Sequence, residues 1–150
     1  MKFTETKMNL FDVDENYYLA HCISSDFALG AGIAKEFRTR GVAKTLENCY
    51  PKFYWHNKGY CLYTPMEGCK GVYNLVTKEN YWGKPTYNTL ISSLVDLKNQ
   101  ILQNRSVFGE IKLAMPMIGC GLDKLEWARV KEIICDLFSD TDIEITICYL

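Results

Sequence analysis

Histidine and paired cysteines are scarce in this sequence, and it contains no long apolar run. Its 150 residues include two histidines, and none of its seven cysteines belongs to a Cys-x-x-Cys pair, so we expect reduced thiols and no metal site. No apolar run approaches the ~18 residues of a membrane helix, and the N-terminus lacks an apolar signal core. These absences predict a cytoplasmic protein, or a nuclear one in a eukaryote, without a membrane partner.

An excess of either charge is also missing. The 17 basic and 18 acidic residues give a formal net charge of −1, so the chain has no bulk attraction for nucleic acid or for an anionic membrane. A polyanionic ligand would have to be held locally. The length and the 48% of hydrophobic residues are typical of one globular domain, which we expect to span residues 1–150 as a monomer.

What the sequence does contain is an alternation of strand and helix patterns. Strands are predicted at residues 2–7, 17–23, 60–64, 72–77, 111–115 and 143–150, and helices at 33–40, 42–49, 87–102 and 127–138. This order predicts an α/β sheet covered on both faces. In such sheets ligands bind beyond the carboxyl ends of the strands. The loops after Ile23, Thr77 and Met115 are therefore the candidate site.

Glycines mark two of these loops where a strand gives way to a helix. Such a junction exposes backbone N–H groups to an anion and adds the positive end of a helix dipole. Alone, the later of these loops is equally typical of a tight turn and the earlier one is more typical of a tight turn, whereas two of them in one small domain could hold two phosphates from opposite sides. The loops are Gly30-Ala31-Gly32-Ile33 and Gly119-Cys120-Gly121-Leu122-Asp123-Lys124.

The loop after Thr77 begins with a lysine. Lys78 ends an apolar strand, so its amine could project over a pocket, although a solvated lysine is the more common outcome at a strand end. Tyr81 and Trp82 follow in the same loop. They could stack on a ligand or simply pack against each other.

Four segments, read together, resemble macrodomains, and among them the lysine-dependent terminal ADP-ribose protein glycohydrolases. These segments are AHCISSDFALGAGIAKEF, LVTK followed by KPTY, MPMIGCGLDKLEW and DIEITICYL, and the similarity is weakest from residue 47 to 71. The resemblance implies a three-layer α/β/α fold with a mixed central sheet. It also implies a cleft for ADP-ribose, whose diphosphate lies between the two glycine loops, and no cofactor.

The same resemblance implies roles for individual residues. Lys78 and Asp123 correspond to the catalytic pair, and Asn9 stands where family members usually carry an adenine-binding aspartate. Asparagine keeps an acceptor oxygen without the charge, so we expect weaker adenine binding or a looser base preference. The implied substrate contacts are Asn9, Leu10, His21, Ser24, Gly30, Ala31, Gly32, Ile33, Met117, Ile118, Gly119, Cys120, Gly121, Leu122 and Leu150.

The implied mechanism is a covalent one. Lys78 attacks the anomeric carbon of the distal ribose, and Asp123 acts as acid and base. An ammonium group is not a nucleophile, so either desolvation would have to favour the neutral amine or Asp123 would have to take the lysine proton as attack begins. The substrate expected from this resemblance is an ADP-ribosylated acidic side chain of a protein.

Several alternatives to this activity stay open on the sequence. O-acetyl-ADP-ribose, an ADP-ribose phosphate ester and ADP-ribosylated DNA all share the ADP-ribose part that the cleft would recognise. A non-catalytic reader of ADP-ribose is the alternative from a different class. The presence of both Lys78 and Asp123 favours an enzyme, because a reader has no chemical need for that pair.

Overall fold

The computed structural model describes residues 1–103 and 110–150 of the chain, and its strands and helices follow the predicted order. The strands are β1 (Lys2–Lys7), β2 (Tyr17–Ser24), β3 (Tyr60–Thr64), β4 (Gly71–Lys78), β5 (Lys112–Met115) and β6 (Glu144–Tyr149). The helices are α1 (Gly32–Thr39), α2 (Val42–Cys49), α3 (Tyr87–Gln103) and α4 (Trp127–Phe138), with a short 3-10 turn at Leu10–Asp12.

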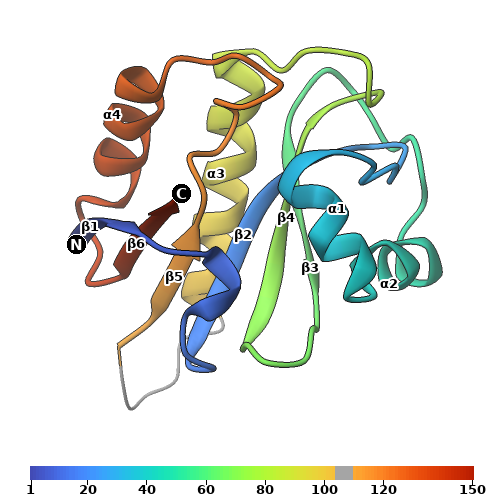
Figure 1. Ribbon diagram of the computed structural model, residues 1–150. Coiled ribbons are helices and arrows are strands. Elements are labelled where there is room, and N and C mark those ends of the chain that lie inside the picture. Colours follow the sequence, from blue (N-terminus) through green and yellow to red (C-terminus); the bar gives the residue numbers. More distant parts are fainter. Residues whose placement is uncertain (104–109) are drawn as a thin grey trace.

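The six strands form one mixed sheet in the order β1-β6-β5-β2-β4-β3. Neighbouring strands are parallel except β3, which pairs antiparallel with β4 at the edge. Parallel strands need crossover connections, and the helices supply them. The predicted three-layer α/β/α fold is confirmed: α1 and α2 lie on one side of the sheet, and α3 and α4 lie on the other (Figure 1).

Strand β4 shows why the sheet must be covered on both faces. Seven of its eight residues are buried, and only the last, Lys78, is partly exposed. Successive side chains point to opposite faces, so Leu75 joins the core under α3 and α4 while Val76 joins the core under α1 and α2. Continuous burial of this kind is typical of parallel sheets with helices on each side.

Some boundaries differ from the prediction in ways that affect the site. Strand β4 extends to Lys78 rather than ending at Thr77, so pairing with Ser24 of β2, just after a shift in register, fixes the backbone of the lysine. Helix α1 begins at Gly32, inside the first glycine loop. The last strand ends at Tyr149, and the side chain of Leu150 is exposed beyond it. The 3-10 turn was not predicted.

The register of the central strands brings together the three loops that follow β2, β4 and β5, at the carboxyl ends of these strands. Ser24 at the end of β2 lies opposite Lys78 at the end of β4, and β2 also pairs in parallel with β5. Since β3 is antiparallel, its first residue, Tyr60, pairs with Val76 near the carboxyl end of β4.

In the described part of the chain, no helix is both long and apolar enough to cross a bilayer.

Candidate active site

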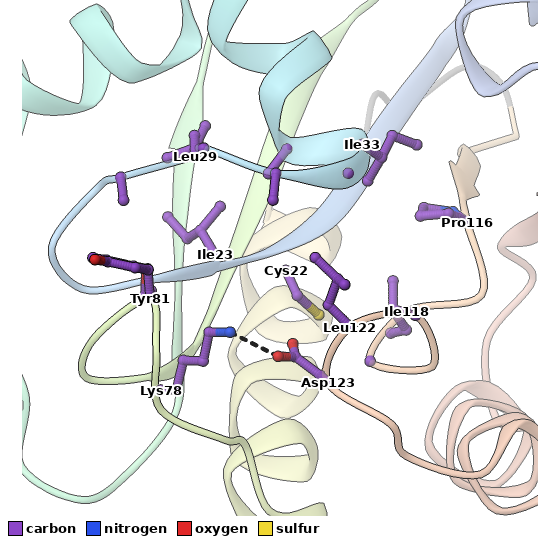
Figure 2. Close-up of a pocket in the computed structure, with 18 of the residues that line it drawn as sticks. Cys22, Ile23, Leu29, Ile33, Lys78, Tyr81, Pro116, Ile118, Leu122 and Asp123 are labelled. Carbon is purple, nitrogen blue, oxygen red and sulfur yellow. Dashed lines mark hydrogen bonds and ion pairs between the residues drawn. The ribbon is translucent and has the colours of Figure 1, made fainter.

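A cleft of about 820 Å³ lies beyond the carboxyl ends of β2, β4 and β5, where the sequence predicts the ligand. The loops that follow these strands supply its walls (Figure 2). Most of the predicted contacts line it: Ser24, Gly30, Ala31, Gly32, Ile33, Met117, Ile118, Gly119, Gly121 and Leu122, together with Lys78 and Asp123.

The two predicted catalytic side chains meet at one end of this cleft. Lys78 Nζ donates to Asp123 Oδ1 at 2.6 Å, although 45 positions separate the residues in sequence. Both side chains are mostly covered, with 15% and 14% of their surface exposed. Figure 2 shows them facing each other from opposite walls. A short, shielded contact of this kind permits direct proton transfer between the two groups.

Hydrogen bonds to the segment after β2 hold the backbone around Lys78. The Ser25 N–H donates to the Lys78 carbonyl at 3.0 Å, and the Ser25 hydroxyl donates to the Glu79 carbonyl at 2.6 Å. The Asp26 carboxylate accepts the Tyr81 N–H at 2.9 Å. The start of the loop after β4 is therefore fixed to the start of the loop after β2, which fixes the direction of the lysine side chain.

The loop that carries Asp123 closes on itself around Gly119. This glycine has φ of 72°, and a Cβ added there would lie 2.9 Å from Leu125 Cδ1. The Leu125 N–H donates to the Gly119 carbonyl at 2.8 Å. Only glycine fits this position without strain. The turn explains why glycine occurs there, and it aims the Asp123 carboxylate back at the cleft.

Helix α1 begins at the opposite wall of the cleft. Its N-cap is Ala31, whose side chain cannot accept a hydrogen bond from the first turn, and that turn contains no acidic residue. The first N–H groups of a helix have no partner within the helix. The start of α1 therefore offers backbone donors and a positive dipole end to an anion in the cleft.

A second lysine, Lys84, whose role the sequence did not reveal, joins the loop after β4 to the loop after β5. Lys84 lines the cleft, and its Nζ donates to the Leu122 carbonyl at 2.8 Å. Leu122 precedes Asp123. Lys78 at the end of β4 and Lys84 in the loop after β4 therefore contact adjacent residues of the loop after β5. Arg38, Tyr81 and Cys22 also line the cleft. The motif KPTY contains Lys84, but nothing in a sequence shows which carbonyl a lysine reaches.

Cys22 lies beside the catalytic pair but is not a competing nucleophile. Burial raises the pKa of its thiol to about 12, and the Asp123 charge adds to that shift. Thiolates, not thiols, attack carbon, so Cys22 is inert at neutral pH. Cys120 does not line the cleft: its thiol contacts the Ile118 carbonyl, and burial raises its pKa as well. The predicted contact of Cys120 can therefore come from its backbone but not from its thiol.

The family resemblance places adenosine against Asn9 and Leu10, near Ser24 and Leu150, and of these residues Ser24 lines the cleft whereas the other three lie outside it. The Asn9 Oδ1 atom, which the sequence assigns to the adenine amino group, accepts the Phe11 N–H at 2.9 Å and caps the 3-10 turn. The Leu10 side chain is buried in the core under α1 and α2, whereas Leu150 is 88% exposed. A part in adenosine binding stays a prediction for these three residues.

His21, a predicted substrate contact, has its side chain in the core and does not line the cleft, so its contact with the substrate stays a prediction. His21 is fully buried in β2, and its ring stacks on Phe37 of α1 with the centroids 3.8 Å apart. Its Nε2 lies 2.6 Å from Asn74 Oδ1, and the Asn74 amide group donates to the Leu62 carbonyl at 2.9 Å. That bond fixes the amide, so Nε2 must donate and Nδ1, which has no partner, carries no proton.

We expect His21 to make the fold sensitive to mild acid. Burial lowers its pKa to about 4, against the opposing effect of the Asn74 hydrogen bond, whereas an unfolded histidine titrates near pH ~6.5. The unfolded state therefore binds the additional proton between these values, and the free energy of unfolding falls as the pH drops from about 6.5 to about 4. The loss approaches about 3 kcal/mol, from ~1.4 kcal/mol per pH unit.

Urea unfolding at pH 7.5, 6 and 5 measures this slope. His21→Leu should flatten it, whereas replacing the exposed second histidine, His56→Gln, should leave it unchanged. An equal slope in His21→Leu and in the unmodified protein would show that other groups cause the acid sensitivity.

Comparison with known proteins first defines the class. Over the described residues the fold is that of solved macrodomains. The macrodomain of Mycobacterium tuberculosis DarG matches with a TM-score of 0.77 at 20% identity, covering 99% of this chain and 97% of that one. The macrodomain of Thermus aquaticus DarG matches with a TM-score of 0.76 at 18% identity, covering 99% and 98%. A comparison with protein-family models found no match.

Sequence comparison then narrows the class. The chain is 39% identical over 147 residues to human ADP-ribose glycohydrolase OARD1. The aligned region covers 97% of this chain and 90% of the relative. The Bos taurus protein of the same name matches to the same extent. A protein of Invertebrate iridescent virus 6 is 37% identical over 79 residues, covering 53% of this chain and 75% of that protein. The chain belongs to the macrodomain family, with the ADP-ribose glycohydrolases, as the sequence motifs indicate.

Proposed function

We propose that this macrodomain binds ADP-ribose and hydrolyses the bond between its distal ribose and the carboxylate of an acidic protein side chain. The observation that carries the proposal is the 2.6 Å contact between Lys78 Nζ and Asp123 Oδ1 in the wall of the cleft. A protein that only bound ADP-ribose would gain nothing from a shielded amine and carboxylate there. The relatives of this chain are named ADP-ribose glycohydrolases, which agrees with hydrolysis by such a pair.

The cleft would hold the diphosphate and the distal ribose of this substrate. The diphosphate would lie between the start of α1 and the loop around Gly119 and Gly121, where backbone N–H groups can approach it closely. The distal ribose would then lie over Lys78 and Asp123. Neither wall alone surrounds the diphosphate, so both loops are required for tight binding.

The reaction would begin with a proton transfer. Asp123 accepts a proton from the Lys78 ammonium while the freed amine attacks the anomeric carbon. The bond from that carbon to the substrate carboxylate breaks, and the carboxylate leaves with the bonding electron pair. Lysyl–ADP-ribose is then the covalent intermediate.

Water completes the turnover. It attacks the same carbon and displaces Lys78, Asp123 returns its proton to the amine, and the proton of the water goes to solvent. The products are ADP-ribose and the free carboxylate, and the ammonium–carboxylate pair is restored. O-acetyl-ADP-ribose also has a carboxylate as its leaving group, so the same groups would act on it.

Reductive trapping tests the proposal directly. The open form of free ADP-ribose carries an aldehyde, with which the Lys78 amine can condense by losing water, and borohydride reduces the resulting imine to a stable amine. We expect one adduct per chain, mapped to Lys78 by mass spectrometry, together with release of ADP-ribose from a glutamyl-ADP-ribosylated protein. Micromolar binding of ADP-ribose by calorimetry without adduct or release would indicate a reader instead.

A further inference from the structure

Large exposed aromatic side chains gather beside the catalytic end of the cleft. Phe53, Tyr81 and Trp82, which we call the aromatic rim, are 57%, 64% and 68% exposed. They come from two segments, before β3 and after β4. Exposed apolar surface that is concentrated at one place, rather than scattered, is typical of an interaction site.

Both segments of the aromatic rim are attached to the same two residues. The Phe53 N–H donates to the Ser25 carbonyl at 2.8 Å, and the Tyr81 N–H donates to the Asp26 carboxylate at 2.9 Å. Ser25 in turn bonds to the backbone of Lys78. The aromatic rim is therefore held in a fixed position relative to the catalytic amine, and Tyr81 belongs both to the rim and to the wall of the cleft.

One ring of the aromatic rim, that of Phe53, is held in the open against a backbone cost. Phe53 has φ of 58°, a conformation that bulky residues rarely adopt. Tyr81 and Trp82 contact each other edge to face, with their centroids 4.9 Å apart, yet both remain mostly exposed. Backbone strain clusters at functional sites, so the strained and exposed Phe53 points to a ligand outside the chain.

We propose that the aromatic rim docks the polypeptide that carries the ADP-ribose group, an inference that rests on the proposed hydrolase function. The leaving group is attached to the carbon that Lys78 attacks, and Tyr81 and Trp82 follow Lys78 in the same loop. A departing protein side chain must pass this loop. Residues flanking the modified glutamate therefore lie against the aromatic rim.

Charge favours a polypeptide over a nucleic acid as this partner. Surfaces that bind single-stranded nucleic acids combine aromatic side chains, which stack on the bases, with a basic groove. Here Lys52 pairs with Glu47 at 3.2 Å, and Lys84 donates to the Leu122 carbonyl, so these two ammonium groups already have partners. The net charge of −1 adds no attraction for phosphates. Exposed aromatic side chains without a basic groove are typical of protein interfaces.

Binding measurements in the inactive Lys78→Ala background test the inference without depending on turnover. The probes are free ADP-ribose and two glutamyl-ADP-ribosylated peptides, one with apolar residues and one with serines around the glutamate. We expect the apolar peptide to bind about tenfold more tightly than free ADP-ribose, a gain typical of one aromatic anchor. The double change Phe53→Ser and Trp82→Ser should abolish this gain and leave free ADP-ribose binding unchanged.

The control is Val95→Ser, which removes an apolar side chain that is 38% exposed on α3, outside the aromatic rim. It should keep the tenfold difference. Equal binding of all three probes by the parent protein would overturn the inference, and so would a rim variant that keeps the preference. Selective loss of binding to an ADP-ribosylated single-stranded oligonucleotide would overturn it in favour of a nucleic-acid carrier. Absence of turnover in the unmodified protein would contradict the hydrolase proposal alone, because these binding ratios do not require it.

Discussion

Replacing Lys78 with alanine should leave ADP-ribose binding largely intact and lower turnover by about 10³-fold or more, the scale expected when an acid–base partner or nucleophile is lost. The nucleophile disappears, and Asp123 loses the group to which it returns a proton. The residues proposed to contact the diphosphate lie on other elements and remain. Single-turnover kinetics on a glutamyl-ADP-ribosylated protein, with calorimetry on ADP-ribose, measure the two effects separately.

Lys98→Ala is the matched control for this experiment. It also removes a lysine that contacts an aspartate, since Lys98 Nζ donates to Asp140 Oδ1 at 2.8 Å, but this pair joins α3 to the region after α4. Turnover should be unaffected. The double variant Lys78→Ala with Asp123→Ala should be little slower than Lys78→Ala alone, because the two residues act as a unit. Full activity of Lys78→Ala would rule out the covalent mechanism.

Placing a carboxylate at the N-cap of α1 should have opposite effects on stability and on binding. Ala31 has the extended backbone of an N-cap residue, with φ of −146° and ψ of 157°. In Ala31→Asp the new side chain can accept N–H groups of the first turn, which should stabilise the fold by about 1 kcal/mol. The same carboxylate would occupy and repel the diphosphate, so we expect affinity for ADP-ribose to fall by about a hundredfold, or ~2.7 kcal/mol.

A second N-cap provides the control for this change. Glu126 caps α4 without a side-chain hydrogen bond and does not line the cleft. Glu126→Asp should therefore improve that cap while ADP-ribose binding stays the same. Urea unfolding and calorimetry on both variants separate the two effects. If Ala31→Asp bound ADP-ribose normally, the diphosphate would not lie at the start of α1.

The fold could be predicted almost completely from the pattern of apolar residues. Buried runs such as 72–77 and the three-and-four spacing of α3 reflect the same burial that stabilises the sheet, so pattern and structure agree. The ends of elements were less certain because one hydrogen bond decides them. The one-residue difference at the end of β4 matters, because the inclusion of Lys78 in the strand fixes the direction of the lysine side chain.

The site was predictable where it depends on backbone shape and less so where it depends on side-chain direction. The two glycine loops are visible in the sequence because each contains one glycine with a positive φ, Gly32 at 58° and Gly119 at 72°, a conformation that favours glycine. His21 and Cys22 are neighbours in a strand buried on both faces, so alternation does not show which of them faces the cleft. The structure places Cys22 there and stacks His21 on Phe37. The proximity of Lys78 and Asp123 came from family resemblance, not from spacing.

The antiparallel edge strand has a consequence for how such enzymes could diversify. Because β3 runs against its neighbour, the segment that leads into it, rather than the one that leaves it, arrives beside Lys78. This segment includes Phe53 and Tyr54 and falls where similarity to the family is weakest. Insertions or grafted sequences there would alter which substrate is recognised without disturbing the parallel strands that hold the catalytic pair.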